Sequence, residues 1–184
     1  MSRALKLRRT YCLDTGPLLD HLLLAFFERE GRQPPEPFFG KVRILRNQAM
    51  KEEFSRFLQS RGPFVTSPGV FIELDRHVQE ACAKQERHGR TRSADGLPYV
   101  SNFREFLQQE FKRLRFEERL VPVEKLRLEE LKRFGPVDAS LMQLVREDRA
   151  MTLVTVDSAL RGECLRYGLP CQSVPELLLG EDTP

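Results

Sequence analysis

The chain has 184 residues and is 40% hydrophobic and 31% charged, which is the composition of a globular protein and excludes a disordered one. Its net charge of +3 and its pI near 8.8 are compatible with a nucleic-acid partner but do not identify one. No apolar run approaches the roughly 20 residues that span a bilayer, and no signal-peptide pattern follows the basic start of the chain. The four cysteines form no C-x-x-C pair, so we expect free thiols. We therefore expect a single cytoplasmic domain over residues 1–184, without membrane contact.

The first half of the chain predicts two strands, each followed by a helix. The strands are expected at 9–13 and 64–66, the helices at 16–29, 42–58 and 68–87, and a loop at 31–40. Ser67 precedes Pro68, a pair typical of an N-cap and a first helical position.

The second half continues the alternation of helices and strands after a loop expected at 86–98. Helices are predicted at 100–116, 126–134, 135–149 and 157–167, strands at 120–123, 151–156 and 170–174, and a terminal turn at 175–179. This alternation favours an α/β fold with a mostly parallel central sheet.

Three aspartates lie at predicted junctions between strands and helices. Asp14 follows the first strand, Asp157 follows the clearest strand of the chain, and Asp138 lies in the first turn of a helix. Residues just past the carboxyl ends of parallel strands gather at one edge of the sheet, where ligands bind. A fourth acid, Glu73, interrupts an apolar run more than one turn into its helix, where a cap cannot explain it.

Carboxylates that gather in one place repel one another unless a cation neutralises them. Oxygen ligands select hard cations such as Mg²⁺ or Mn²⁺, which activate water and neutralise charge on phosphodiesters. The pattern thus points to metal-assisted phosphodiester hydrolysis. The alternative is structural, because aspartate is a preferred N-cap and Glu73 can be a partly exposed residue on a ragged helix face.

The segment Leu13-Asp14-Thr15-Gly16-Pro17-Leu18-Leu19 resembles the opening motif of PIN-domain ribonucleases. Glu73, the segment 138–141 and the segment 155–157 are similar to the later acidic motifs of that family and occur in the same order, so the resemblance covers about residues 9–179. It implies a three-layer α/β/α fold, one or two Mg²⁺ or Mn²⁺ ions, and an endoribonuclease that is often the toxin of a toxin–antitoxin pair.

The resemblance also implies roles for individual residues. Asp14, Glu73 and Asp138 would be the principal metal ligands, and Asp157 would complete the catalytic site directly or through water. Thr15 and Ser158 would hydrogen-bond these ligands. A metal-bound water would attack phosphorus and leave 5′-phosphate and 3′-hydroxyl ends. The implied partners are RNA, an antitoxin protein and a second copy of the chain in a homodimer.

The chain departs from compact toxins of this family in a longer region at about 84–126, which is rich in Arg and Lys. Lys112, Arg113 and Arg115 could position RNA, since cations dominate non-specific phosphate binding. The alternative is a solvated helix pair, because glutamates are interleaved with these bases. A nuclease outside the toxin group would fit the longer region as well.

Other functional classes have weaker support. Asp14-Thr15-Gly16 is also the aspartic-protease triplet, but here it runs into a helix instead of a β-rich fold. Gly16 stands where a haloacid-dehalogenase-type phosphatase needs its second acid, and His21, His77 and His88 have no metal-binding spacing. The strongest rival is a non-catalytic PIN-like module that binds RNA or protein within an RNA-processing or defence complex.

Overall fold

A five-stranded parallel sheet forms the centre of the protein within the described residues, which are 10–34, 38, 47–87 and 96–180 of a computed structural model. The strand order is β3-β2-β1-β4-β5. The bounds are β1 Thr10–Leu13, β2 Phe64–Thr66, β3 Phe116–Glu118, β4 Met151–Val154 and β5 Cys171–Gln172. The α/β class and the parallel sheet predicted from the alternation of elements are thereby confirmed.

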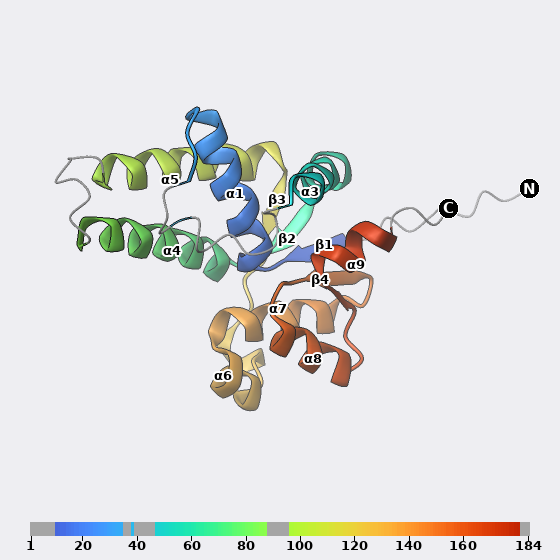
Figure 1. The fold of residues 1–184 in the computed structure, drawn as a ribbon. Coiled ribbons are helices and arrows are strands. Elements are labelled where there is room, and N and C mark those ends of the chain that lie inside the picture. The colour runs from blue at the N-terminus through green and yellow to red at the C-terminus, as the bar shows by residue number, and fades with distance from the viewer. Residues whose placement is uncertain (1–9, 35–37, 39–46, 88–95, 181–184) are drawn as a thin grey trace, which may run out of the picture.

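The helices cover both faces of this sheet and give a three-layer α/β/α architecture (Figure 1). One layer contains α1 (Thr15–Arg29), α3 (Gln48–Arg61), α4 (Pro68–Arg87) and α5 (Gly96–Arg113). The other contains α6 (Leu128–Phe134), α7 (Pro136–Glu147) and α8 (Ser158–Arg166), with the 3₁₀ turn η1 (Val123–Lys125) before them. The last helix, α9 (Val174–Leu179), packs against α3. Parallel strands connected by right-handed crossovers distribute their helices in this way.

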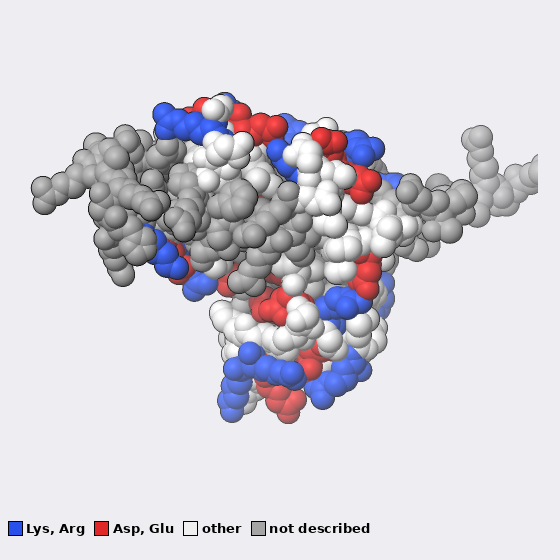
Figure 2. All heavy atoms as spheres, in the orientation of Figure 1, with Lys and Arg blue, Asp and Glu red and all other residues white. Residues whose placement is uncertain are grey.

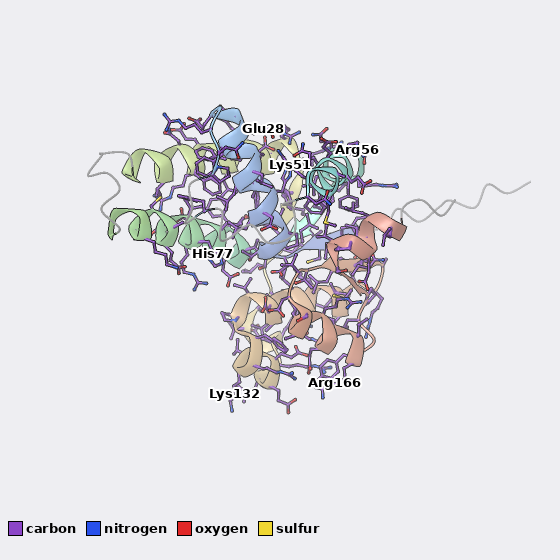
Figure 3. All side chains as sticks on the ribbon, viewed as in Figure 1. Glu28, Lys51, Arg56, His77, Lys132 and Arg166 are labelled. Atoms are coloured by element: carbon purple, nitrogen blue, oxygen red, sulfur yellow. The ribbon has the colours of Figure 1, made fainter. Side chains whose placement is uncertain are left out.

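Aromatic packing holds the first layer together. Phe26 of α1 lies between two rings of α5, with its ring centroid 5.4 Å from that of Phe103 and 5.5 Å from that of Phe106. At the surface, Lys51 of α3 pairs with Glu28 of α1 at 2.8 Å, and both side chains are labelled in Figure 3. The region at 84–126 therefore contributes core residues to the domain as well as charged surface.

The third strand lies earlier in the chain than predicted. The expected strand at 120–123 is wrong, because Leu120 and Val123 are 80% and 73% exposed, and β3 occupies 116–118 instead. Phe116 pairs in register with Phe64 of β2 and packs on its ring at 5.6 Å. The packing of this one ring explains why β3 forms at 116–118, although its other two residues are glutamates.

Two other boundaries differ from the prediction. The expected loop at 86–98 is helical at its described ends, since α4 continues to Arg87 and α5 begins at Gly96; its middle lies outside the described residues. The expected turn at 175–179 is the helix α9, which Ser173 opens with a capping box to Glu176. The predicted helix start at 42–46 lies outside the described residues.

The topology fixes where a ligand would bind. From the central strand β1 the chain first adds β2 and β3 on one side, and later β4 and β5 on the other. The strand order therefore reverses between β1 and β4, which pair in register from Thr10 with Met151 to Leu13 with Val154. In open α/β sheets, ligands bind beside the carboxyl ends of strands at such a reversal.

Candidate active site

Asp14 stands at the reversal point, directly after β1. Its side chain is only 6% exposed and is held by two donors. The backbone N–H of Thr15 donates to Oδ1 at 2.6 Å, and the hydroxyl of Thr155, just past β4, donates to Oδ2 at 2.6 Å. Each carboxylate oxygen keeps a lone pair for a further partner. Asp14 is therefore both the N-cap of α1 and a fixed pair of oxygen ligands.

Burial raises the pKa of Asp14 to about 6. The hydrogen bonds from Thr155 and Thr15 oppose this rise, while the negative charges of Glu73 and Asp157 add to it. The ionised form of Asp14 is thus stabilised by its two hydrogen-bond donors and destabilised by the negative charges of its acidic neighbours.

Glu73 reaches the same place from α4. The hydroxyl of Thr15 donates to its Oε2 at 2.7 Å. Thr15 consequently touches two of the predicted acids, through its N–H to Asp14 and through its hydroxyl to Glu73. The half-buried position of Glu73 results from this contact, and its carboxylate points at the start of α1 instead of at open solvent.

Asp138 lies in the first turn of α7 and is half-buried. Its carboxylate makes no hydrogen bond or ion pair with any described residue. Its pKa is raised to about 7, first by burial and then by the negative charges of Asp14, Glu73 and Asp157 in that order of effect. Asp138 is therefore an uncompensated carboxylate beside three others.

Asp157 is exposed and serves as the N-cap of α8. Its Oδ1 accepts from the backbone N–H groups of Ala159 at 2.7 Å and Leu160 at 3.0 Å. Its own N–H donates to the Thr155 hydroxyl oxygen at 3.0 Å. The neighbouring Ser158, predicted to support the site, is exposed and makes no side-chain hydrogen bond with the described residues.

These contacts connect three of the four acids in one hydrogen-bonded chain. It runs from Glu73 through Thr15 to Asp14, and from Asp14 through Thr155 to the backbone of Asp157. Acidic side chains are visible in Figure 2 where the layer of α1 and α4 meets the layer of α7. The structure thus places the four acids that the sequence singled out, from four separate elements, where their charges act on one another.

The fit of these residues to a divalent cation depends on their spacing and on their donor atoms. In the described part of the chain, no group of three or more His, Cys, Asp or Glu side chains is arranged so that it could hold a metal ion as it stands. The donor set nevertheless fits a hard cation, because it offers only oxygen ligands and its charges are mutually repulsive. Ser67, at the same sheet edge between β2 and α4, adds a buried hydroxyl without a hydrogen-bond partner among the described residues.

Three hydroxyl residues at this edge were missed or misjudged from the sequence. Thr155 fixes Asp14, and the Thr66 hydroxyl donates to the carbonyl of Leu13 at 3.0 Å, which holds the end of β1. The predicted side-chain cap from Ser67 is wrong, because only its backbone carbonyl accepts a bond, from Val70 N–H. Each of the three residues ends or directly follows a strand. That position in the sequence could have indicated that their hydroxyl groups lie at the edge of the sheet where the acids gather.

The predicted basic residues lie away from the four acids, at the end of α5. Arg113 pairs with Glu110, whereas Lys112 and Arg115 have no carboxylate partner among the described residues. Arg115 has a φ of 56°, the left-handed conformation that usually belongs to glycine after a helix.

The two described histidines do not form a site together. His21 is buried in α1, where burial lowers its pKa to about 4, and its Nδ1 lies 3.3 Å from the Ser55 hydroxyl. His77 lies on α4 beside Glu80, 3.8 Å away (Figure 3), and His88 lies outside the described residues. All four cysteines are buried, and none of them forms a disulfide bond.

No helix among the described residues is long and apolar enough to cross a membrane. The chain matches no protein-family model and no curated protein, so its resemblance to PIN-domain ribonucleases remains an expectation that rests on its own motifs.

Proposed function

We propose that this protein is a divalent-cation-dependent endoribonuclease whose site consists of Asp14, Glu73, Asp138 and Asp157. The observation that carries the proposal is the hydrogen-bonded chain through Thr15 and Thr155, which fixes acids from α4, β1 and β4 beside the unpaired Asp138. A fold gains no stability from collecting like charges at one point. Their juxtaposition is explained when they share a positively charged ligand.

The oxygen-only donor set selects Mg²⁺ or Mn²⁺. Asp14, Glu73 and Asp138 would hold the cation, and Asp157 keeps Oδ2 free of its cap bonds for the same purpose. When bound, such a cation activates water and neutralises charge that develops on a phosphodiester. One or two ions would fit the number of carboxylates.

The chain's own residues orient the carboxylates. Thr15 prevents rotation of both Asp14 and Glu73, and Thr155 fixes the second oxygen of Asp14. Mutation of residues that orient metal ligands in this way typically lowers metal affinity or activity about 10-fold to 100-fold. RNA is the proposed substrate because the four acidic motifs resemble those of PIN-domain ribonucleases, and the net charge of +3 is compatible with a polyanion.

The test is cleavage of a labelled single-stranded RNA by the purified full chain in Mg²⁺, in Mn²⁺ and in EDTA. We expect metal-dependent cleavage that Asp138→Asn abolishes. Glu129→Gln is the matched control, because Glu129 is an exposed acid in the first turn of α6 without an ion pair among the described residues. A single-stranded DNA of the same sequence is run in parallel. Metal-dependent cleavage of DNA but not RNA would refute RNA as the substrate. Equal activity of the two variants would refute the assignment of the site to the four acids.

The second candidate is a non-catalytic RNA-binding or protein-binding module. It is favoured by the cap roles of Asp14 and Asp157, which give two of the acids a structural purpose. It predicts RNA binding that EDTA does not change and no cleavage in any metal. The toxin role, the antitoxin and the homodimer remain predictions from the resemblance.

A further inference from the structure

An aromatic groove lies between α4, α5 and β3. Its volume is about 580 Å³, and Phe71, Phe111 and Phe116 form its floor. The rings of Phe111 and Phe116 are stacked with centroids 4.5 Å apart, and Phe71 meets Phe111 edge-on at 6.0 Å. All three side chains are half-buried, so each keeps part of its ring accessible to a ligand. Together they form an apolar surface that can receive a flat ring.

The rim of the aromatic groove carries polar groups that have no partner of their own. Gln108 and Lys112 line the groove and make no hydrogen bond or ion pair with any described residue. The amide of Gln108 can both donate to and accept from the edge of a base, and the ammonium of Lys112 can bind a phosphate. Arg104, by contrast, is held by Asp75 through two hydrogen bonds of 2.7 and 2.8 Å.

The groove is separate from the four acids. Phe71 and Glu73 are two residues apart on α4 and therefore lie on nearly opposite sides of that helix. Glu118, which also lines the groove, ends β3, and β3 is two strands away from β1 in the sheet. Two strand spacings separate β3 from β1 by roughly 10 Å, and Phe116 begins β3 whereas Asp14 follows the end of β1, so a short single-stranded segment would have to cross the sheet both sideways and along the strands.

We infer that the aromatic groove holds an unpaired base of a single-stranded RNA while a phosphate of the same strand lies at the four acids. The ligand is identified by a stacking surface, an amide for the base edge and a free cation for the backbone, which is how sequence-tolerant single-strand sites are built. Arg115, exposed and without a carboxylate partner among the described residues, adds a second cation at the same end of α5. This inference rests on the proposed function for the position of the phosphate.

The test is binding of a labelled single-stranded RNA to the full chain in EDTA, followed by fluorescence anisotropy. Phe71→Leu keeps the apolar volume but removes the aromatic face, so we expect binding to weaken about 5-fold to 100-fold. Phe134→Leu is the matched control, because Phe134 is a half-buried ring of α6 on the other side of the sheet. Thermal unfolding confirms that both variants fold.

A second comparison separates stacking from other effects. RNA with abasic sites lacks the stacking partner, so wild type and Phe71→Leu should bind it equally. Lys112→Gln should weaken binding to both RNAs and reduce the salt dependence by about one ion. Unchanged binding by Phe71→Leu, or an equal loss with Phe134→Leu, would overturn the inference and leave an apolar peptide as the occupant to test. Base-dependent binding without cleavage would refute the nuclease and not the groove.

Discussion

Neutralising Asp138 should stabilise the metal-free protein at alkaline pH. Asp138 has no hydrogen-bond partner to lose among the described residues, and Asp138→Asn removes its repulsion with Asp14, Glu73 and Asp157. Because the folded-state pKa is raised, the stability that Asp138 contributes is fully present below its unfolded pKa of 3.8 and is lost as pH rises through about 7. The advantage of the variant should therefore grow between pH 5 and pH 8.

The magnitude follows from the size of the shift. A rise from 3.8 to about 7 would be worth about 4 kcal/mol if it were counted in full. Asp138 is only half-buried and also gains about 0.5 kcal/mol from the N-terminus of α7, so we expect about 1–2 kcal/mol of stabilisation at pH 8. At pH 5 the gain should be about 1 kcal/mol smaller.

Urea unfolding followed by circular dichroism, in EDTA at pH 5 and pH 8, measures this difference. Glu129→Gln loses a similar helix-dipole interaction but leaves the repulsion among the four acids unchanged. It should therefore change the free energy of unfolding by less than about 0.5 kcal/mol at both pH values. The reasoning is refuted if Asp138→Asn destabilises the protein at pH 8, or if its effect is the same at both values. Adding Mg²⁺ should reverse the order, because wild type then gains a ligand that the variant binds poorly.

Two further substitutions test the packing and the hydrogen bonds around the acids. A methyl group on Gly16 would come within 2.3 Å of Val156 Cγ2, so Gly16→Ala should destabilise the fold by about 1–3 kcal/mol. Gly162→Ala, on α8 with nothing within 4 Å, should stabilise it by about 0.5–1 kcal/mol in the same urea titration, and the opposite order would contradict the structure. Thr155→Val removes the hydroxyl from Asp14 Oδ2 and should raise the Asp14 pKa further and weaken Mn²⁺ binding about 10-fold to 100-fold by calorimetry. Thr152→Val, a half-buried substitution in β4 just before Thr155, should leave the affinity unchanged.

The positions of Asp14, Glu73 and Asp157 in the fold could be predicted because each has a simple physical signature. Asp14 and Asp157 follow apolar strands, and the carboxyl ends of parallel strands meet at one edge whatever the details of the fold. Glu73 could be identified because a carboxylate inside an apolar run needs a partner, and the Thr15 hydroxyl is that partner.

The remaining features depend on contacts between distant residues. Thr155 and Asp14 are 141 positions apart, and only the pairing of β1 with β4 brings them together. The aromatic groove is built from three phenylalanines on three elements, each of which resembles an ordinary core residue in its own segment. Phe116 could not be assigned to a strand for the same reason, since its contact with Phe64 decides the register.

The most direct test of the four-acid site is a calorimetric titration with Mn²⁺ at pH 6.5 and pH 8.5, in buffers of different ionisation enthalpy. With pKa values of about 7 for Asp138 and about 6 for Asp14, the metal-free protein should carry about one proton on this pair at pH 6.5 and almost none at pH 8.5. Cation binding should therefore release about one proton at pH 6.5 and none at pH 8.5, and Asp138→Asn should abolish both the release and the tight binding. Absence of Mn²⁺ binding by wild type, or equal binding by Asp138→Asn, would contradict the claim that these carboxylates form one cation site.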